Sequence, residues 1–270
     1  MSAVATPTLY LEGPAFWAPT LPGWDIARAA FRGEGAPAEP PSKRPAPQVL
    51  APAERRRAPD SVAIALEVAG AAVAAAGRNA ADLPCVFASA HGDLAINDYM
   101  SSTLVDHPTQ LSPIKFHNSV HNAAVGYWTI GTGCMAASNS LTAFENSFAA
   151  GLLEAAVQCA ADTQAVLLAG FDVQAVGPLG SVTRSDGLLA GALVIAPERT
   201  AHSVAAFDWA LLHGAHAAPA LQSDAARAVS GNAMANALPL FEALARGTAG
   251  ALVLPLSATL ALQLTLRPVG

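Results

Sequence analysis

Glu145 stands at the point of this chain where residue types and spacing come closest to a catalytic arrangement. It follows a mildly apolar run of strand length, residues 134–144, and opens a segment whose apolar residues recur at helical spacing. That helix is expected to end at Asp162, and the fully apolar run 165–170 then reads as a strand. Strand, sharp turn, helix and parallel strand form a right-handed crossover by default. Acyl-transfer enzymes keep a nucleophile at such a turn, at the positive end of the helix.

Other nucleophiles of the segment lie away from this turn. Cys134 begins the predicted strand and Cys159 lies near the end of the predicted helix. Ser138 and Ser147 are candidates for a Ser-dependent acyltransferase, but no His/Asp arrangement supports them. The three cysteines of the chain lack CxxC spacing, which argues against a disulfide framework or a zinc site.

The stretch from Gly131 to Asp172 resembles the nucleophile segment of β-ketoacyl synthases, which belong to the thiolase superfamily. In that family a Thr-Gly, an apolar strand, the nucleophilic Cys, an Ala-rich helix and an Ala-Gly-Gly strand follow in this order. Thr132-Gly133 and Ala169-Gly170 match the Thr-Gly and the Ala-Gly without a gap. The family's Cys then falls on Glu145, so the resemblance implies that the nucleophilic thiol is absent.

Composition limits the classes of function. The chain has 270 residues, of which 53% are hydrophobic and only 13% charged, with a net charge of -6. Nucleic acid is therefore not expected as a partner, and no apolar run reaches the length of a membrane span. No signal peptide is recognised, so we expect a cytoplasmic protein. The low charge is explained either by a large hidden interface or by an Ala-rich composition.

The elements are expected in the following order. Short strands or helices are predicted at residues 8–13 (strand), 24–32 (helix), 62–76 (helix capped by Asp60-Ser61), 84–90 (strand), 97–104 (helix), 190–195 and 203–212 (strands), 235–245 (helix) and 248–265 (buried strand). Residues 33–59 contain seven prolines between Pro37 and Pro59 and are expected to form a surface loop. The cluster Arg55–Arg57 ends this loop and is either a solvated approach to the next helix or a surface that steers an acidic carrier protein.

The segment 112–122 contains two histidines, His117 and His121, four residues apart. That spacing suits a metal on one helix face, but no carboxylate or third ligand lies nearby with useful spacing. We therefore expect no metal, and interpret both histidines as structural hydrogen-bonding groups. The segment resembles the ketosynthase stretch that precedes a helix and packs near the subunit interface.

The alternation of helices and apolar strands through residue 200 predicts an α/β fold with a buried, mainly parallel sheet. The resemblance implies a thiolase-like fold, which packs two related halves with helices between two sheets. Residues 1–200 resemble the complete first half. Residues 201–270 are too short for a complete second half and resemble only its last helix and closing strands.

The shortened second half bears on catalysis. A ketosynthase uses two histidines from that half, which hold the malonyl carboxylate and stabilise the enolate. Ser230-Gly231-Asn232 stands where the family's Gly-His turn would precede the last helix, and His202, His213 and His216 lack the flanking residues of either motif. Neither a cofactor nor a complete catalytic set is expected. Glu145 is then either a carboxylate stabilised by the helix dipole or an imitation of a loaded thiolate or malonate.

The first functional hypothesis is a non-catalytic subunit. The chain resembles the short ketosynthase-like proteins encoded beside aryl-polyene and related polyketide genes, which look like chain length factors. Such a subunit would pair with a full β-ketoacyl synthase and shape its acyl tunnel, and an acyl carrier protein is a further possible partner. Two alternatives remain: a malonyl-carrier-protein decarboxylase or acyltransferase, and a homodimeric acyl-binding module.

The partner is expected to contact the segment from Ser112 to Thr142. The resemblance places residues 117–125 and the predicted strand 134–144 at the ketosynthase dimer axis. The residues expected at this interface are His117, His121, Leu141, Ala143 and Phe144. Interfaces of this obligate type bury about 2,000–5,000 Å² and have a core-like composition.

Overall fold

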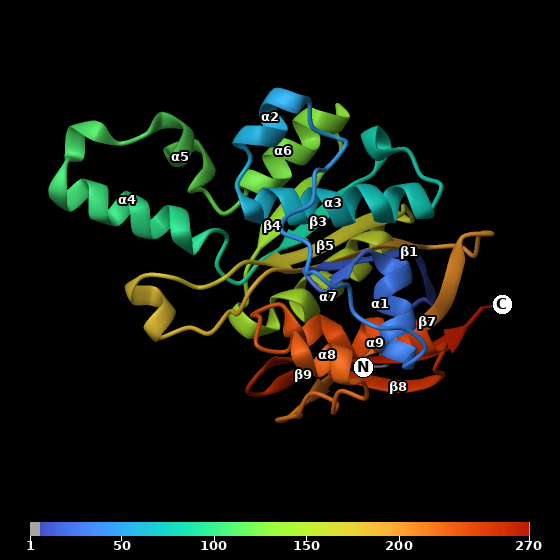
Figure 1. The fold of residues 1–270 in the computed structure, drawn as a ribbon. Helices are drawn as coiled ribbons and strands as arrows, with labels where there is room; N and C mark the ends of the chain where they lie inside the picture. Colours follow the sequence, from blue (N-terminus) through green and yellow to red (C-terminus); the bar gives the residue numbers. More distant parts are fainter. Residues whose placement is uncertain (1–5, 270) are drawn as a thin grey trace.

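The computed structural model describes residues 6–269, and its strands form one mixed sheet (Figure 1). The strands are β1 (Leu9–Ala18), β2 (Leu21–Pro22), β3 (Cys85–Ala88), β4 (Ser138–Leu141), β5 (Val166–Asp172), β6 (Leu189–Ala196), β7 (Ser203–His213), β8 (Gly250–Ser257) and β9 (Leu260–Pro268). Their order in the sheet is β4-β3-β5-β6-β1-β7-β9-β8, and β2 pairs with β1.

Parallel pairing is confined to one end of the sheet. β3 pairs in parallel with β4 on one side and with β5 on the other, whereas the remaining ladders are antiparallel. The α/β, thiolase-like class expected from the sequence is confirmed, but the expectation of a mainly parallel sheet holds only for β4, β3 and β5. The reason is that the chain returns from β5 to β6 through a loop without a crossover α-helix, so these two strands run antiparallel.

The helices cover both faces of this sheet. They are α1 (Trp24–Arg32), α2 (Pro52–Arg57), α3 (Asp60–Ala75), α4 (Leu94–Asp106), α5 (Pro113–Asn118), α6 (Ala123–Thr132), α7 (Ser147–Asp162), α8 (Asp224–Ala228) and α9 (Leu238–Arg246). Short 3₁₀ turns are η1 (Ala80–Asp82), η2 (Pro108–Gln110), η3 (Phe144–Asn146), η4 (Pro178–Ser181) and η5 (Ala235–Ala237). In Figure 1, α3 and α6 lie on one side of β3 and β5, and α7, α9 and α1 lie on the other.

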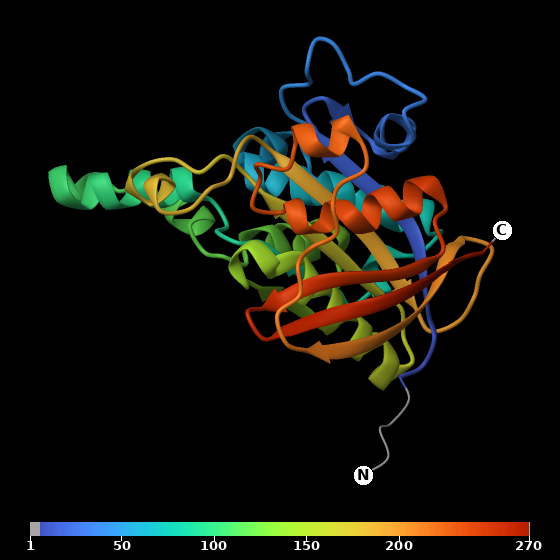
Figure 2. The same cartoon turned by 90° about the horizontal axis from the view of Figure 1, so that it is seen from below.

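The two ends of the sheet enclose a layer of helices. One apolar cluster joins side chains of α7 and α9 both to β5 and to Leu252, Leu254 and Leu262 of β8 and β9. Strand β1 connects the two ends because it pairs with β6 and with β7. The helices are therefore sandwiched as the thiolase resemblance implies, but between the ends of one continuous, twisted sheet rather than between two separate sheets (Figure 2).

A second apolar cluster lies on the other face, under α3. Ten residues of this Ala-rich helix are buried, and they pack against β1, β5 and β6. Small side chains allow the helix to approach the sheet closely. At Gly13, which has φ 53°, a Cβ would lie 2.3 Å from the carbonyl oxygen of Ala72. Only glycine meets both the backbone angle and the close approach at this position.

Several predicted bounds need correction. Helix α1 has the predicted bounds, whereas residues 134–137 are not strand and only Ser138–Leu141 pairs with β3. The Pro-rich segment contains the short helix α2. Asp60 and Ser61 do not cap α3, because the helix begins at Asp60 after Pro59 and the Ser61 hydroxyl donates to Asp93 instead. Residues 248–265 form the antiparallel pair β8–β9 rather than one strand.

The segment from α4 to α5 projects from the body as an arm (Figure 1). Only Leu94 and Ile96 are buried in α4, so this helix is anchored to the body at its N-terminal end. The loop between β5 and β6, which contains η4, extends in the same direction. Both projections leave the molecule beside β4, the strand at the edge of the sheet.

Candidate functional site

The turn between β4 and α7 is the place where the sequence predicted a degenerate nucleophile site. Glu145 lies in η3, directly before α7, so its predicted place between a strand and a buried helix is observed. The strand is at the edge of the sheet, not in its centre. The correspondence between Glu145 and the family's Cys stays a prediction, because the left-handed backbone of this turn belongs to Phe144, with φ 50°.

A buried hydroxyl holds this turn in place. The Ala143 N–H donates to Ser147 Oγ over 2.9 Å, and the same hydroxyl donates to the Phe144 carbonyl oxygen over 2.6 Å. Ser147 is fully buried. The bonds therefore fix Phe144 in a backbone conformation that costs a non-glycine residue about 1–2 kcal/mol. The Phe144 side chain points outward and is 73% exposed.

A cleft of about 630 Å³ opens beside Glu145. Five separate segments line it: Glu145 and Asn146 from the turn, Arg184 from the loop before β6, residues 216–221 before α8, residues 230–239 around η5, and residues 255–258 at the end of β8. The cleft brings Ser230-Gly231-Asn232 opposite Glu145. His216 lacks the flanking residues of a ketosynthase histidine motif, so the sequence predicts no role for it. The sequence also gives no sign of Arg184 or Asn236, because nothing in their local sequence connects segments so far apart.

Asn232 secures the wall of this cleft. Its side-chain amide donates to the carbonyl oxygens of Asp172, Asp186 and Gly187 over 3.1–3.3 Å, and its Oδ1 accepts from the Met234 N–H over 2.9 Å. The amide nitrogen thus joins the segment before η5 to the end of β5 and to the residues before β6, while Oδ1 is bonded within its own segment. The geometry gives Asn232 a structural role.

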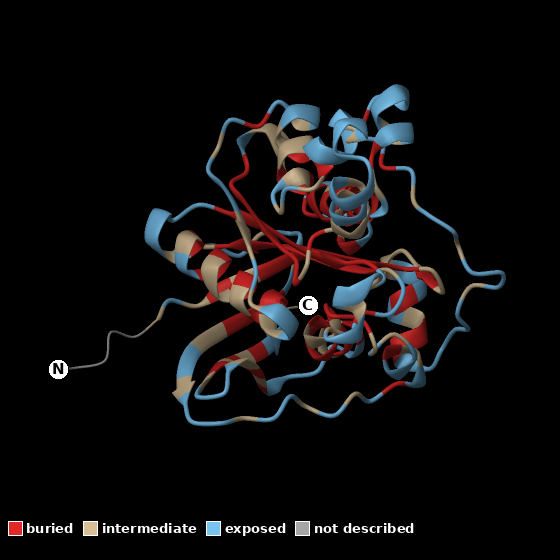
Figure 3. Ribbon diagram, turned by 90° about the vertical axis from the view of Figure 1, so that its left-hand side faces the viewer, coloured by how far each residue is buried: buried red, intermediate tan, exposed pale blue. Residues whose placement is uncertain are grey.

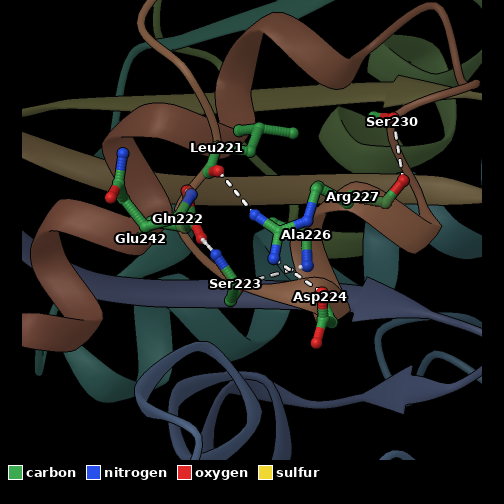
Figure 4. Close-up of polar contacts among 8 residues, drawn as sticks. All are labelled: Leu221, Gln222, Ser223, Asp224, Ala226, Arg227, Ser230 and Glu242. Atoms are coloured by element: carbon green, nitrogen blue, oxygen red, sulfur yellow. Dashed lines mark hydrogen bonds and ion pairs between the residues drawn. The ribbon is translucent and has the colours of Figure 1, made fainter.

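Glu242 of α9 fixes the segment on the other side of the cleft (Figure 4). Its buried carboxylate accepts from the N–H groups of Gln222 and Ser223 over 2.9 and 2.7 Å, and from the Ser223 hydroxyl over 2.6 Å. Ser223 Oγ in turn accepts from the Ala226 N–H, which begins α8. This carboxylate thus holds the turn that follows the cleft-lining residues 216–221.

A second buried carboxylate, Asp172, lies at the end of β5. It accepts from Ser89 Oγ and the Ala90 N–H, each over 2.8 Å, and from the His91 N–H over 3.2 Å. Burial raises the pKa of Asp172 to about 7, against the lowering effect of these three hydrogen bonds. Asp172 therefore organises the turn that leads from β3 to the arm.

The two predicted histidines do not form a pair. His117 is exposed at the end of α5, with its ring edge against Tyr127, whereas His121 lies beyond the end of that helix. His121 Nε2 is 2.9 Å from the Ser89 carbonyl oxygen and Nδ1 is 2.9 Å from Ser140 Oγ. Because a carbonyl only accepts, Nε2 carries the proton. His121 is thus a structural hydrogen-bonding group that links β4 to the turn after β3.

His91 joins the two projections of the molecule. Its Nε2 lies 2.6 Å from Thr183 Oγ1, which belongs to the loop between β5 and β6. Burial, and secondly the nearby His121, lower the pKa of His91. The described residues contain no group of three or more His, Cys, Asp or Glu side chains that could hold a metal ion.

Large apolar side chains are exposed on the arm, on the η4 loop and around both ends of β4, and we call this surface the apolar end. It comprises Leu104, Val105, Ile114, Phe116, Val120, Ile130, Met135, Phe144, Leu179 and Val182. They come from α4, α5, α6, the segments before and after β4 and the η4 loop, and Met135 and Val105 are 94% and 83% exposed. Figure 3 views the molecule from the side of the arm. Of the predicted interface residues, Phe144 lies here, whereas Leu141 packs partly into the core.

Comparison with known proteins identifies the family. The family described as beta-ketoacyl synthase, N-terminal domain, matches residues 30–253. The chain belongs to this family. No curated protein is similar enough to count as a match.

Three solved structures share the fold over nearly the whole of both chains. A ketosynthase (ApeO) in complex with its chain length factor (ApeC) from Xenorhabdus doucetiae matches with a TM-score of 0.71, 21% identity and coverage of 96% of this chain and 99% of the other. The ishigamide ketosynthase/chain length factor matches with a TM-score of 0.71 and 14% identity, and the match covers 97% of this chain and 100% of the other. The AntDE:AntF complex of a type II polyketide synthase acyl carrier protein with its ketosynthase matches with a TM-score of 0.71 and 9% identity, and covers 96% of this chain and 99% of the other. At these identities the likeness shows the fold.

Among residues 6–269, no helix combines the length and the apolar character needed to cross a bilayer.

Proposed function

We propose that this chain is a non-catalytic ketosynthase-like subunit, a chain length factor, that pairs with a full β-ketoacyl synthase. The observation that carries this proposal is the apolar end together with the edge of β4. One edge of β4 pairs with β3, and among the described residues no strand pairs with the other. An open strand edge beside ten exposed apolar side chains is a surface that a stable soluble protein covers with a partner.

The similar structures support the choice of partner. Two of them are described as a ketosynthase with its chain length factor, and the third is a complex of an acyl carrier protein with its ketosynthase. The present chain would extend the partner's sheet through β4, and the arm would lie against the partner and help to shape its acyl tunnel. The proposal includes a role in type II polyketide, aryl-polyene or fatty-acid-like biosynthesis in the cytoplasm. We also propose that residues 1–200 form a complete first thiolase-like half and that residues 201–270 form an abbreviated second half.

The absence of an available thiol supports a non-catalytic role. Cys85, Cys134 and Cys159 are free but buried, and none lies in the turn before α7. Burial raises the pKa of Cys85 and of Cys159 to about 12, so their thiolates are not formed at neutral pH. A carboxylate at position 145 does not replace them, since its acyl product would be an anhydride that transfers or hydrolyses.

An acidic carrier protein is proposed as a transient partner at α2. This helix has no buried residue and carries Arg55, Arg56 and Arg57. Arg55 is bonded to the Leu50 carbonyl oxygen and Arg57 pairs with Glu54, whereas the exposed Arg56 has neither contact among the described residues. Such a cluster raises the association rate of an acidic protein more than it contributes to affinity.

Co-expression tests the pairing. The chain and a full ketosynthase from the same gene cluster are co-purified, and the mass of the complex is measured by light scattering after size exclusion. A one-to-one complex is expected. The chain alone, incubated with malonyl- and acyl-carrier protein, should release no condensation product. A well-behaved monomer that ignores the ketosynthase, or carbon–carbon bond formation by the chain alone, would overturn the proposal.

The cleft beside Glu145 favours a second candidate, in which this chain itself binds or processes acyl groups. Its size, about 630 Å³, suits a small molecule. As a decarboxylase or acyltransferase the chain would release carbon dioxide or exchange acyl groups in the absence of a ketosynthase, and replacing Glu145→Gln would change that rate. As an acyl-binding module it would form a tight homodimer without turnover.

A further inference from the structure

A second cavity, of about 380 Å³, lies between α4 and the segment 176–179. Its apolar walls include Leu94 and Val105 of α4 and Pro178 and Leu179 opposite. Leu94, Asp98, Ser101 and Val105 recur along α4 at helical spacing and therefore share one face of the helix. The cavity is a groove that runs along the arm at the apolar end, and we call it the arm groove.

Two carboxylates belong to the lining of the arm groove, Asp98 and Asp106. No Lys or Arg of the described residues lies within ion-pair distance of either. Lys115, the cation of the arm, lies instead over the Tyr99 ring at 3.9 Å. The groove thus combines an apolar wall with negative charge that this chain does not neutralise.

Asp98 is held in its place by the opposite wall. Gly177 has φ 68°, and a Cβ there would lie 2.2 Å from Asp98 Oδ1. The backbone of the η4 loop therefore packs directly on the Asp98 carboxylate, which is partly buried. A partly buried carboxylate without a cation is less stable than one with a partner, so a cation that enters the groove gains more than it would at an open surface.

We propose that the arm groove receives two Arg or Lys side chains of the ketosynthase subunit. Asp98 and Asp106 are eight residues apart on α4, about 12 Å along the helix axis, so one basic side chain would pair with each carboxylate. The aliphatic stems would lie against the apolar wall formed by Val105, Pro178 and Leu179. This inference rests on the proposed function, because the ketosynthase is the protein that would cover the apolar end. The groove would then contribute to the choice of partner, since a partner that lacks these basic residues leaves two carboxylates covered and unpaired.

A second copy of this chain is a weaker occupant. Its exposed basic cluster, Arg55–Arg57, is complementary in charge to the groove. However, α2 and the arm groove are different surfaces of the same molecule, so such a contact would be head-to-tail and would form open chains unless it closed into a ring. Binding of the ketosynthase to the groove would not require such a polymer. The experiment below distinguishes self-association of this protein from binding to the ketosynthase.

The test measures the affinity of the full chain for the separately purified ketosynthase at low and at high salt. The variants are Asp98→Asn, Asp106→Asn and both together, which remove charge with little change of shape. We expect the double variant to bind about tenfold more weakly at low salt and to lose most of the salt dependence. Asp162→Asn, which removes one charge at the exposed end of α7, should bind as wild type.

The outcomes separate this inference from the proposed function. If wild type binds the ketosynthase and the double variant binds equally well at every salt concentration, the inference fails and the pairing stands. If wild type does not bind the ketosynthase, both fail. If wild type instead forms concentration-dependent polymers that Asp98→Asn disperses, the occupant is a second copy. A thermal melt of each variant verifies that the fold is kept.

Discussion

The cleft beside Glu145 and the apolar end differ in how many of their side chains have partners within the molecule. Around the cleft, Asn232, Glu242 and Asp172 each make three or more hydrogen bonds, and all three are buried. At the apolar end, large side chains and a strand edge face solvent. These three polar groups are therefore engaged in holding the frame. Asn236, which also lines the cleft, differs from them, since its buried side-chain amide has no hydrogen-bond partner among the described residues. The exposed apolar groups lie on the surface that we propose a partner covers.

Under the proposed function, this difference explains how the fold is kept without a nucleophile. Asp172 holds the turn that leads from β3 to α4, and it lies at the end of β5, the strand that closes the crossover through α7. A turn without a thiol leaves this frame intact, whereas losing the frame would displace the arm and the η4 loop. The comparison predicts that changes at the apolar end affect pairing and that changes at the buried carboxylates affect folding.

The largest expected effect is on pairing. Replacing Phe116→Asp puts a charge on α5 at a side chain that is 62% exposed, so the monomer should fold normally. Because the partner would cover this unpaired charge, the affinity of the complex should fall about 100-fold or more. Light scattering of the co-purified complex measures this. Leu211→Asp on β7, 46% exposed and outside the apolar end, is the matched control.

Leu141 is unsuitable for that experiment. The sequence analysis expects Leu141 at the interface, but its side chain packs against the core cluster. An Arg at this position would therefore disturb folding as well as pairing. Equal loss of pairing in Phe116→Asp and Leu211→Asp would argue against a specific apolar interface.

The second effect concerns the buried carboxylate at the end of β5. Asp172→Ala leaves Ser89 Oγ and the N–H groups of Ala90 and His91 without their acceptor. We expect a loss of about 3 kcal/mol in the free energy of unfolding, measured with urea. Glu145→Ala, at an exposed position, should change stability by less than about 0.5 kcal/mol. A neutral outcome for Asp172→Ala would show that the carboxylate does not hold this turn.

The pH dependence of stability sharpens the same contrast. The pKa of Asp172 is about 7 in the folded chain, above its usual value of 3.8, so between these pH values the folded state binds a proton that the unfolded state has lost. The contribution of Asp172 to stability should therefore fall as pH rises through this window, by up to about 1.4 kcal/mol per pH unit. Asp172→Asn should lack this contribution, so the difference in stability between the two proteins should change with pH. Urea titrations of both proteins at several pH values would detect it, and parallel curves would contradict the raised pKa.

The third comparison decides which residue occupies the apex of the turn. Phe144 has the left-handed backbone, whereas the gapless match to the family selects Glu145. In Phe144→Cys and Glu145→Cys, alkylation by iodoacetamide against pH gives each thiol's pKa and rate. The native thiols are buried and should stay silent. We expect Cys at position 144 to react about tenfold faster, and neither variant to catalyse condensation. Faster reaction at position 145 would support the sequence match.

Sequence reasoning succeeded where local pattern and tertiary environment agree. α1 has an amphipathic pattern bounded by Gly23 and Gly33, and β5 is apolar throughout because both of its faces are covered. It failed where pairing decides. Cys134 to Ala137 are as apolar as a strand, but β4 begins only at Ser138, opposite Cys85 of β3. The cleft escaped prediction because Glu145, Arg184 and Asn236 meet only through the folded sheet.

The smallest expected effect separates backbone strain from the aromatic ring at the turn. Phe144→Gly and Phe144→Asn relieve the left-handed backbone, whereas Phe144→Ala removes the ring and keeps the strain. Gly and Asn should therefore be about 1 kcal/mol more stable than Ala, as measured by urea unfolding of the chain alone.

The same three variants test what the ring does for pairing. The Phe144 ring is 73% exposed and belongs to the apolar end, so all three replacements should weaken the ketosynthase complex to a similar degree, whatever their stabilities. If affinity instead follows stability, with Gly and Asn pairing better than Ala, the backbone conformation is the feature that the partner requires. If all three pair as wild type, Phe144 faces the acyl tunnel or solvent rather than the partner's surface, and the interface is carried by the arm and by β4.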